Sequence, residues 1–556
     1  MSRRQPNTVL FWGAGATASL RMCTTEEQGR ILLALSRKND SSSYGDCLNS
    51  FKYVFGAHFE TVCDLLTLLD DSPTSEGLSV GYRMSGFSAQ QLALMRKYGA
   101  DFGRTDDERR NRLTMMRMRY DWAAVMRILK SNRYDVEIKD GGEKPSATFV
   151  QDVYSLIDAN VSAGTGIHIF DDDAGSSRSD FIDIVRLRAA KSALIMFHNL
   201  MFAASWNSLG DSDKLDGYKN FFRLLADYRA EEFKETQSPT SHIRVVSMNF
   251  DPIFWWFVKN ADEEYNRQPI VVGDAHSPLF LGEDLDQVDS VRPMAEGQEA
   301  RVGDLLRADT AAFVNTHGDR EEERCLAKYQ TMQMLFPHGS PNIKICHCCG
   351  KTTLYQGNKL SWESASLFPP FFMHDIAWGA LPTTEVFGRL DSPVSEKVKW
   401  DEGERDYIQC RNCGQGIRMC DTEMLVQSGL KAQPSWLLQR IAHDVDAEVM
   451  QAQHIILLGY SLPRDDAIWV AELKARCQRS RENVYCSLVN YFTGAPAKWM
   501  TWDEVRNFKE ANPGLDMRPM EMAKSIFGEK YLRVHLQGFP AMAQDKESII
   551  DLFGVK

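Results

Sequence analysis

Short apolar and β-branched runs near both ends of the chain predict the strands of one sheet. The predicted strands cover Thr8–Trp12, His242–Met248, His454–Leu458 and Asn483–Val489. A helical period over Trp436–Gln451 precedes the third of them. Strands that alternate with helices predict an α/β fold with a Rossmann-like parallel sheet, assembled from distant parts of the chain.

Helical periodicity dominates between the first two of these strands. A polar cap predicts a helix over Thr24–Leu35, and the pattern over residues 51–200 is mostly helical. A Gly-, Asp- and Ser-rich stretch at Asp171–Ser179 predicts a loop there. Further apolar helices are predicted over Ala190–Trp206 and Tyr218–Phe233. The sequence therefore predicts a large helical insertion in the sheet domain.

Length and composition narrow the class of protein. The chain has 556 residues, more than one hydrophobic core usually supports, which predicts two or three structural units. It contains no apolar run of about 18 residues and no signal-peptide pattern, so we expect a cytoplasmic protein without a membrane contact. The net charge of −12 argues against a dedicated nucleic-acid-binding face.

A glycine-rich turn follows the first predicted strand. Gly13–Ala18 has the pattern G-x-G-x-x-A, in which the glycines permit a tight turn and a close approach of a pyrophosphate. A small third residue lets helix and strand pack closely. The alternative is a tight turn without a ligand, and no acidic ribose-binding residue follows about 20 residues later.

Two pairs of cysteines have the spacing of zinc ligands. Cys346 and Cys349, and Cys410 and Cys413, form two Cys-x-x-Cys-Gly turns separated by about sixty residues. Four thiolates form a closed tetrahedral site, which predicts a structural Zn²⁺ rather than a catalytic one. Residues in these turns that could replace a ligand are His347, Cys348 and Cys420. Reduced cysteines in loops are the alternative.

Five separated segments, in this order, resemble the sirtuin family across most of the chain. Gly13–Thr17 is similar to the family's G-A-G-x-S cofactor loop, and Ser247–Asp251 to its T-x-N-x-D segment. Phe336–Ser340 resembles the H-G motif before the zinc knuckle. Leu457–Pro463 is similar to the G-x-S strand end beside the cofactor, and Val489–Asn490 to the strand that meets the adenosine ribose.

The resemblance implies a role for each matching residue. The NAD-binding residues would be Gly13, Ala14, Gly15, Thr17, Gly459, Ser461 and Asn490. Asn249 and Asp251 would hold the nicotinamide ribose and a reactive water, and His338 would be the general base. The alternative for the Asn-x-Asp segment is a cap on a helix that starts at Pro252. His317, in a second His-Gly pair, is the alternative base.

The chain departs from protein-deacylating sirtuins in segments that bear on function. Leu20–Thr25 stands where those enzymes carry a G-I-P-x-F-R segment, and no V-x-F-G-E segment for an acyl peptide follows the second cysteine turn. Thr24–Glu27 and Gly459–Pro463 look instead like sirtuin-like effectors of bacterial anti-phage defence, which consume NAD. The resemblance therefore implies a regulated antiviral effector that hydrolyses NAD⁺ to nicotinamide and ADP-ribose.

Two other functions fit the same residues. A sirtuin-type protein deacylase or ADP-ribosyltransferase is favoured by the zinc pairs, which deacylases keep. A non-catalytic sensor would only bind NAD or ADP-ribose in the same pocket. The expected partners are NAD, further copies of the chain in a homo-oligomer, and a protein partner or activator.

These patterns divide the chain into an interrupted domain with two insertions. Residues 1–35 begin a Rossmann-like NAD-binding domain and residues 36–235 form the helical insertion. Residues 236–345 continue the first domain with the catalytic segments, and residues 346–425 form the zinc-binding module. Residues 426–556 complete the Rossmann-like domain and end in a C-terminal tail.

Overall fold

The computed structural model describes the sheet domain, parts of the helical region and several short strands. The described residues are 7–20, 22, 28, 117–118, 120–131, 148–170, 179–207, 214–236, 240–251, 253–254, 257–258, 261, 331–345, 352–354, 407–409, 416–418, 422–424, 436–463, 466–479 and 483–554. The helix predicted over Thr24–Leu35 lies outside them, apart from Gln28.

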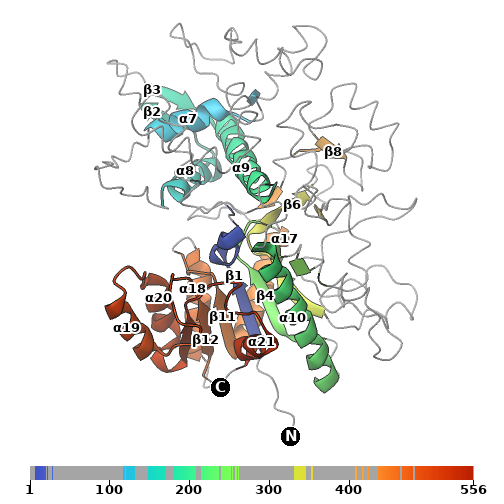
Figure 1. The fold of residues 1–556 in the computed structure, drawn as a ribbon. Coiled ribbons are helices and arrows are strands. Elements are labelled where there is room, and N and C mark those ends of the chain that lie inside the picture. Colours follow the sequence, from blue (N-terminus) through green and yellow to red (C-terminus); the bar gives the residue numbers. More distant parts are fainter. Residues whose placement is uncertain are drawn as a thin grey trace, which may run out of the picture.

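A six-stranded parallel sheet forms the centre of the fold (Figure 1). Its strands are β1 (Thr8–Trp12), β4 (Thr240–Ser247), β5 (Thr331–Leu335), β11 (His454–Leu458), β12 (Tyr485–Val489) and β13 (Leu532–His535). They lie in the order β13-β12-β11-β1-β4-β5, and every neighbouring pair is parallel. The chain starts in the middle of the sheet, moves outward through β4 and β5, and returns to the other side of β1. This order is that of doubly wound α/β sheets, and the winding reverses between β1 and β11.

The strands agree closely with the hydrophobic pattern of the sequence. The predictions for β1 and β11 are confirmed at both ends, whereas β4 lies one or two residues earlier and β12 starts two residues later than predicted. Residue for residue, β1 pairs with both β4 and β11. The outer strands β5 and β13 had no prediction because a polar residue interrupts the apolar run of each, Gln333 in β5 and Arg533 in β13.

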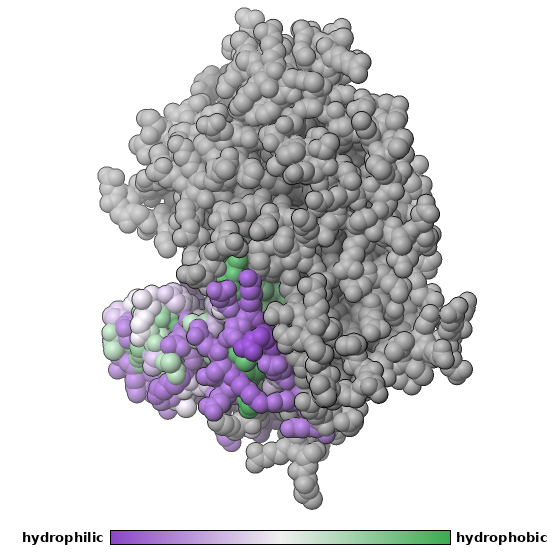
Figure 2. Space-filling view, turned by 45° about the vertical axis from the view of Figure 1, so that its right-hand side comes forward, coloured by the Kyte–Doolittle hydropathy of each residue, from purple (hydrophilic) through white to green (hydrophobic). Residues whose placement is uncertain are grey.

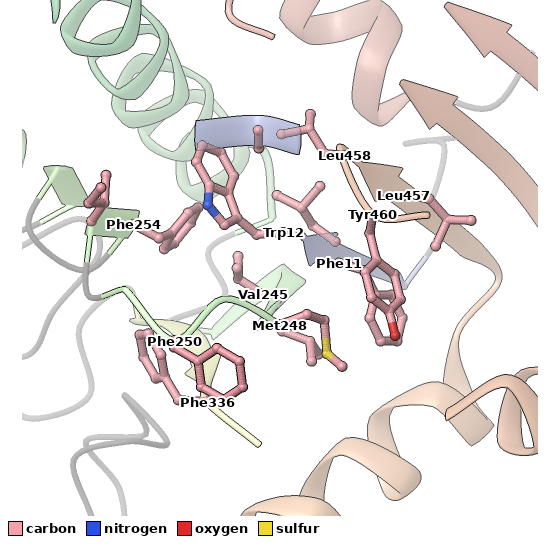
Figure 3. Close-up of a cluster of buried hydrophobic side chains, with 14 of the residues drawn as sticks. Phe11, Trp12, Val245, Met248, Phe250, Phe254, Phe336, Leu457, Leu458 and Tyr460 are labelled. Carbon is pink, nitrogen blue, oxygen red and sulfur yellow. The ribbon is translucent and has the colours of Figure 1, made fainter. Parts of the chain in front are cut away.

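The core lies on both faces of the central strands. All five residues of β1 and all five of β11 are buried, as expected for a parallel sheet covered on both sides. Successive side chains of a strand point to opposite faces. Trp12 accordingly packs edge-on against Phe254, with ring centres 4.9 Å apart, while Phe11 stacks on Tyr460 (Figure 3). Aromatic side chains therefore fill the layer directly below the carboxyl ends of β1 and β4.

Helices cover this sheet and connect its strands. The helix α10 (Lys214–Thr236) packs against β4 and against α21 (Lys546–Phe553), and α17 (Trp436–Gln451) packs against β5 and α18 (Ala467–Arg479) (Figure 1). The bounds of α17 are those predicted, and α10 contains the predicted helix over Tyr218–Phe233. Between β12 and β13 lie α19 (Trp502–Ala511), α20 (Arg518–Phe527) and the 3₁₀ helix η8 (Glu529–Tyr531).

A helical unit lies beyond the carboxyl ends of the strands (Figure 1). It consists of α7 (Trp122–Ser131), α8 (Thr148–Ala163), α9 (Ile184–Asn207) and a hairpin of β2 (Ile167–Phe170) and β3 (Ser179–Ile182). The hairpin was not predicted, since its strands are short and adjoin the Gly-, Asp- and Ser-rich stretch at Asp171–Ser179, whose last residue begins β3. The predicted helix over Ala190–Trp206 forms most of α9. This unit reaches the sheet domain where His198 of α9 contacts Phe250 edge-on, with ring centres 6.2 Å apart.

Short strands flank the two predicted cysteine turns. A small antiparallel sheet joins β6 (Gly339–Ile345), β7 (Thr352–Leu354) and β10 (Thr422–Met424), and β8 (Tyr407–Gln409) pairs with β9 (Gly416–Arg418). The cysteines themselves, Cys346, Cys349, Cys410 and Cys413, lie outside the described residues.

The described surface is mainly hydrophilic on the face shown in Figure 2. Large apolar side chains that are exposed come from separate elements: Met118, Phe181, Val185, Ile468, Tyr491 and Ile550. Among the described helices, none combines the length and the apolar composition that a membrane crossing needs.

Candidate functional site

The predicted site residues follow the carboxyl ends of neighbouring parallel strands. The turn at Gly13 follows β1, Asn249 follows β4, His338 follows β5 and Gly459 follows β11. A backbone hydrogen bond joins the ends of β1 and β4: the Met248 amide donates to Trp12 O at 2.8 Å. Segments that are up to several hundred residues apart in the chain therefore share one edge of the sheet.

The glycines after β1 are required by the close approach of β11. A Cβ atom on Gly13 would lie 2.5 Å from the carbonyl oxygen of Gly459, and one on Gly15 would lie 2.9 Å from the same oxygen. Gly459 itself has a φ of 63°, in the left-handed region that favours glycine. The Gly15 amide donates to the Gly459 carbonyl at 2.9 Å. The packing of two strand ends thus explains these glycines without a ligand, while Ala14 and Gly15 remain exposed to solvent.

Thr17 and Asn249 join the turn after β1 to the segment after β4. The Asn249 side-chain amide donates to Thr17 Oγ1 at 3.2 Å, and both residues are buried. The Thr17 hydroxyl lies 3.3 Å from the Ala14 carbonyl oxygen, to which it can donate. On the other side of the turn, the Tyr218 hydroxyl of α10 donates to the Ala16 carbonyl. The short helix α1 (Ala14–Thr17) and the 3₁₀ turn η1 (Ala18–Leu20) are therefore fixed by side chains from the segment after β4 and from α10.

Asp251 is a buried carboxyl group beside this pair. Burial raises the pKa of Asp251 to about 7, and hydrogen bonds from the Ile253 and Asp251 amides and from Asn249 and Thr17 lower it only partly. Asp251 Oδ1 accepts the Ile253 amide at 3.2 Å, which is the capping contact expected from the alternative interpretation of this segment. The same carboxyl group thus caps a helix start and changes its charge near neutral pH.

His338 lies in the turn between β5 and β6 and is fixed on three sides. Its Nδ1 is 3.1 Å from the carbonyl oxygen of Met248, and its ring stacks on Phe250 with centres 5.4 Å apart. Its Nε2 is 3.1 Å from Asp466 Oδ1. The His338 side chain is only 6% exposed. The predicted base therefore lies against the segment that carries Asn249 and Asp251.

Asp466 and Tyr460 are site residues that the sequence did not predict. Asp466 is buried and precedes α18, and its Oδ2 accepts a hydrogen bond from the Tyr460 hydroxyl at 2.7 Å. An Asp directly before a helix is the usual pattern of an N-cap, so its position gave no signal for a contact with His338. Tyr460 lies between Gly459 and Ser461, inside the segment that resembles the G-x-S strand end.

The residues predicted for the adenosine half lie on the β11 and β12 side of the same edge. Gly459 packs on the turn after β1, and its amide donates to Val489 O at 3.0 Å. Ser461 is exposed, and Asn490 directly follows β12, where its side-chain oxygen accepts the Tyr491 amide at 2.9 Å. These residues therefore share the sheet edge with His338 and Asn249 but lie on the other side of β1.

Other predicted site residues lie outside the described part of the chain. These are the alternative base His317 and the zinc ligands Cys346, Cys349, Cys410 and Cys413. Within the described residues, no cluster of three or more His, Cys, Asp and Glu side chains could hold a metal ion.

The arrangement combines a histidine, a carboxyl group that titrates near neutrality and an amide donor in one buried site. Figure 3 shows the buried hydrophobic side chains that pack near the ends of β1 and β4, among them Trp12, Met248, Phe250 and Phe336. Hydrogen bonds and charges act strongly in such low-dielectric surroundings. A site of this kind can orient a polar ligand, stabilise positive charge and move a proton.

Comparison with known proteins adds no family to this description. No protein-family model matches the chain, and no curated protein matches it.

Proposed function

We propose that the protein hydrolyses NAD⁺ to nicotinamide and ADP-ribose. The observation that carries the proposal is the convergence of Thr17, Asn249, Asp251 and His338 beside the point where the winding of the sheet reverses. Doubly wound sheets bind dinucleotides in the crevice outside this point. The resemblance of the same residues to sirtuin motifs supports the choice of NAD⁺.

In this proposal the dinucleotide crosses the carboxyl edge of the sheet. Its pyrophosphate lies over Ala14 and Gly15, two residues that are exposed to solvent after the end of β1. The adenosine half extends toward Gly459, Ser461 and Asn490. The nicotinamide ribose lies toward Asn249 and Asp251, on the β4 side of β1. We propose a Rossmann-like NAD-binding domain on these grounds.

The proposed chemistry breaks the bond between C1′ of the ribose and the nicotinamide nitrogen, which leaves with the electron pair. A water oxygen bonds to C1′, and its proton passes to His338 Nε2. Positive charge develops on the ribose as the bond breaks, and the Asn249 carbonyl oxygen and the Asp251 carboxylate can stabilise it. Because the pKa of Asp251 is about 7, the carboxylate form increases as the pH rises through neutrality.

The test measures products with and without an acyl acceptor. Purified full-length protein is incubated with NAD⁺, with or without an acetyl-lysine peptide, and nicotinamide and ADP-ribose are quantified by chromatography. Release of both without peptide is the expected result. Release that requires the peptide indicates a deacylase, and saturable binding without release indicates a sensor.

Two variants tie the activity to the site. His338→Ala removes the proposed base and is expected to abolish turnover while NAD⁺ binding persists. His443→Ala changes an exposed histidine on α17 and is expected to leave turnover unchanged. Full activity of His338→Ala, or loss in His317→Ala instead, would reject the assignment of the base.

We also propose that Cys346, Cys349, Cys410 and Cys413 hold a structural Zn²⁺. The support is the pairing of the strands that flank each turn, with Ile345 opposite Thr352 and Gln409 opposite Gly416. Two cysteine turns joined to antiparallel strands suit a closed zinc site. Metal analysis of Cys346→Ser and Cys410→Ser should show loss of bound zinc, and retention of stoichiometric zinc would reject the site.

Uncontrolled hydrolysis of NAD⁺ would deplete the NAD⁺ of the host cell. We therefore propose that the activity is regulated, in keeping with the resemblance to anti-phage effectors, and that other copies of the chain or a protein activator take part.

A further inference from the structure

We propose that Asp466 blocks the reactive nitrogen of His338, so that the described arrangement is a resting state of the site. The inference rests on the proposed function in naming NAD⁺ as the ligand. The contact itself, between Asp466 Oδ1 and His338 Nε2 at 3.1 Å, is independent of that function.

The imidazole of His338 has only one nitrogen that could act as a base. A carbonyl oxygen can only accept, so the contact between Nδ1 and Met248 O at 3.1 Å places a proton on Nδ1. The lone pair that can take a proton is therefore on Nε2. The Met248 carbonyl and the stacked Phe250 ring already fix the orientation of the imidazole. Orientation of the ring thus needs no contribution from Asp466.

Asp466 Oδ1 occupies the position beside His338 Nε2 that the reacting oxygen would need. A general base must lie about 2.6–3.2 Å from the oxygen whose proton it removes. Asp466 Oδ1 lies 3.1 Å from Nε2, within this distance. A nitrogen and a carboxyl oxygen in this contact share one proton, whichever of them carries it. While the contact persists, no water or ribose hydroxyl can give a proton to Nε2.

This arrangement differs from that of a catalytic triad. In a triad the carboxylate binds the imidazole nitrogen that does not react, orients the ring and stabilises its charged form. In this protein the Met248 carbonyl occupies the non-reacting nitrogen and the carboxyl group occupies the reacting one. The geometry therefore favours blocking over assistance.

The described part of the segment between β11 and Asp466 contains two residues with a positive φ. The Tyr460 hydroxyl holds Asp466 Oδ2 at 2.7 Å, and Tyr460 follows Gly459, whose φ is 63°. Leu462 has a φ of 53°, a conformation that is unfavourable for a side chain of this type and is enriched at switch regions. A change of backbone conformation at Leu462 would withdraw the carboxyl group of Asp466 from His338.

The first test does not involve NAD⁺. Diethyl pyrocarbonate acylates an imidazole nitrogen whose lone pair is free, and peptide mass spectrometry follows the modification of His338 over time. In Asp466→Ala, His338 should react about tenfold faster or more, the factor that a hydrogen bond to a charged group typically represents. The exposed His443 in the same sample is the internal control and should react equally in both proteins. Equal rates at His338 in the wild-type protein and in Asp466→Ala would overturn the proposal.

The second test uses turnover of NAD⁺. Asp466→Ala should release nicotinamide about tenfold faster than the wild-type protein, and the double variant Asp466→Ala, His338→Ala should lose this gain. A fall in the rate of Asp466→Ala would overturn the proposal and make Asp466 a positioning residue. If neither protein releases nicotinamide, the proposed hydrolase fails, and the acylation rates still decide whether Asp466 blocks His338.

A second variant tests the proposal with a smaller change, in case Asp466→Ala fails to fold. Tyr460→Phe keeps the aromatic ring that stacks on Phe11 and removes only the hydroxyl that holds Asp466. It should increase the acylation rate of His338 in the same direction as Asp466→Ala, though less. Circular dichroism and the melting temperature confirm folding of each variant, and a folded Tyr460→Phe with an unchanged rate counts against the proposal.

Discussion

The Asn249 side-chain amide donates a hydrogen bond to the Thr17 hydroxyl oxygen at 3.2 Å, although 232 residues separate them in the chain. This contact joins the turn after β1 to the segment after β4. It also brings both residues to Asp251, whose carboxyl group interacts with the two side chains. The contact therefore connects the stability of the glycine turn with the charge of the site.

We predict that Thr17→Val slows NAD⁺ hydrolysis about tenfold, because one hydrogen bond in a buried network is lost while the shape of the side chain is kept. The hydrogen bond from Thr17 lowers the pKa of Asp251, so its loss in Thr17→Val raises that pKa above about 7. If the Asp251 carboxylate is the active form, the rising limb of the pH–rate profile shifts to higher pH. The rate of nicotinamide release measures both effects. It is followed from about pH 5 to about pH 9, which brackets the titration of a carboxyl group with a raised pKa and of a histidine.

Thr17→Ser is the matched control because it keeps the hydroxyl group. It should retain a wild-type pH profile with a small loss of stability. A Thr17→Val variant with the rate and profile of the wild-type protein would show that the contact with Asn249 has no role in turnover.

Part of this fold follows from local sequence pattern. Apart from His454, the residues of β1 and β11 are apolar or β-branched; both strands are buried on both faces and end before a glycine, so their ends could be predicted to the residue. Asn249 and His338 follow a strand or precede the cysteine turns, which marked them as candidates. Their convergence could not be predicted from pattern alone, because it depends on the order of strands that are far apart in the chain.

Other parts have no local signal. The strand β5 is a five-residue run with a polar Gln333 at its centre, so it shows no clear period. Asp466 has the sequence context of a helix cap, and its contact with His338 arises only when β5 and β11 share a sheet. The reason for Gly13 is likewise tertiary, since the backbone of Gly459 fills the space that a side chain would need.

We predict that Gly13→Ala destabilises the protein by about 1–3 kcal/mol, the usual effect of overpacking. The φ of Gly13 is −112°, which alanine adopts freely, so the backbone conformation is not the reason. The reason is steric: the added Cβ would lie 2.5 Å from Gly459 O and from Tyr460 Cα, and both are backbone atoms. The midpoint of urea unfolding measures the loss.

Gly514→Ala is the control for this effect. A Cβ atom at Gly514 would meet nothing within 4 Å, so the substitution should be neutral or slightly stabilising, through a less flexible unfolded chain. If both variants unfold at the same urea concentration, close packing of the strand ends does not explain Gly13.

We predict that Glu232→Gln destabilises the protein by about 3–5 kcal/mol, because a buried cation loses its counter-charge. Glu232 on α10 pairs with the fully buried Arg229 and accepts hydrogen bonds from Ser241 Oγ at 3.1 Å and the His242 amide at 2.7 Å. Hydrogen bonds and charges of His242 and Arg229 overcome the effect of burial and lower the pKa of Glu232 to about 2. Unfolding in urea at neutral pH gives the change in stability.

The pH dependence separates the charge from packing. Because the folded pKa of Glu232 is depressed from 4.5, its contribution is present above 4.5 and is lost as the pH falls toward about 2. The difference in stability between the wild-type protein and Glu232→Gln should therefore narrow in acid. Glu231→Gln, which removes an exposed pair with Lys546, is the control and should change stability by at most about 1 kcal/mol. A difference that stays constant from pH 7 to acid would assign the effect to packing.

We predict that Glu472→Gln stabilises the protein at and above pH 7 and has little effect in acid. Glu472 of α18 is half-buried, and burial first, then the nearby Asp446 of α17, raises its pKa from 4.5 to about 7. A carboxyl group with a raised folded pKa favours the folded state at low pH, and this advantage is lost as the pH rises from 4.5 through about 7. Glutamine stays neutral throughout, so the stability difference between the two proteins should open over this interval. The negative charges of Asp446 and Glu472 repel each other, so Asp446→Asn should lower the pKa of Glu472. The stability that the protein loses between acid and neutral pH should then be smaller. The melting temperature measured from pH 4 to 9, about the range over which carboxyl groups and buried acids titrate, follows both variants.

Glu521→Gln, at an exposed position of α20, is the control, and its curve should run parallel to the wild-type curve. A wild-type curve that runs parallel to that of Glu472→Gln across this interval would show that Glu472 titrates as an ordinary surface carboxylate.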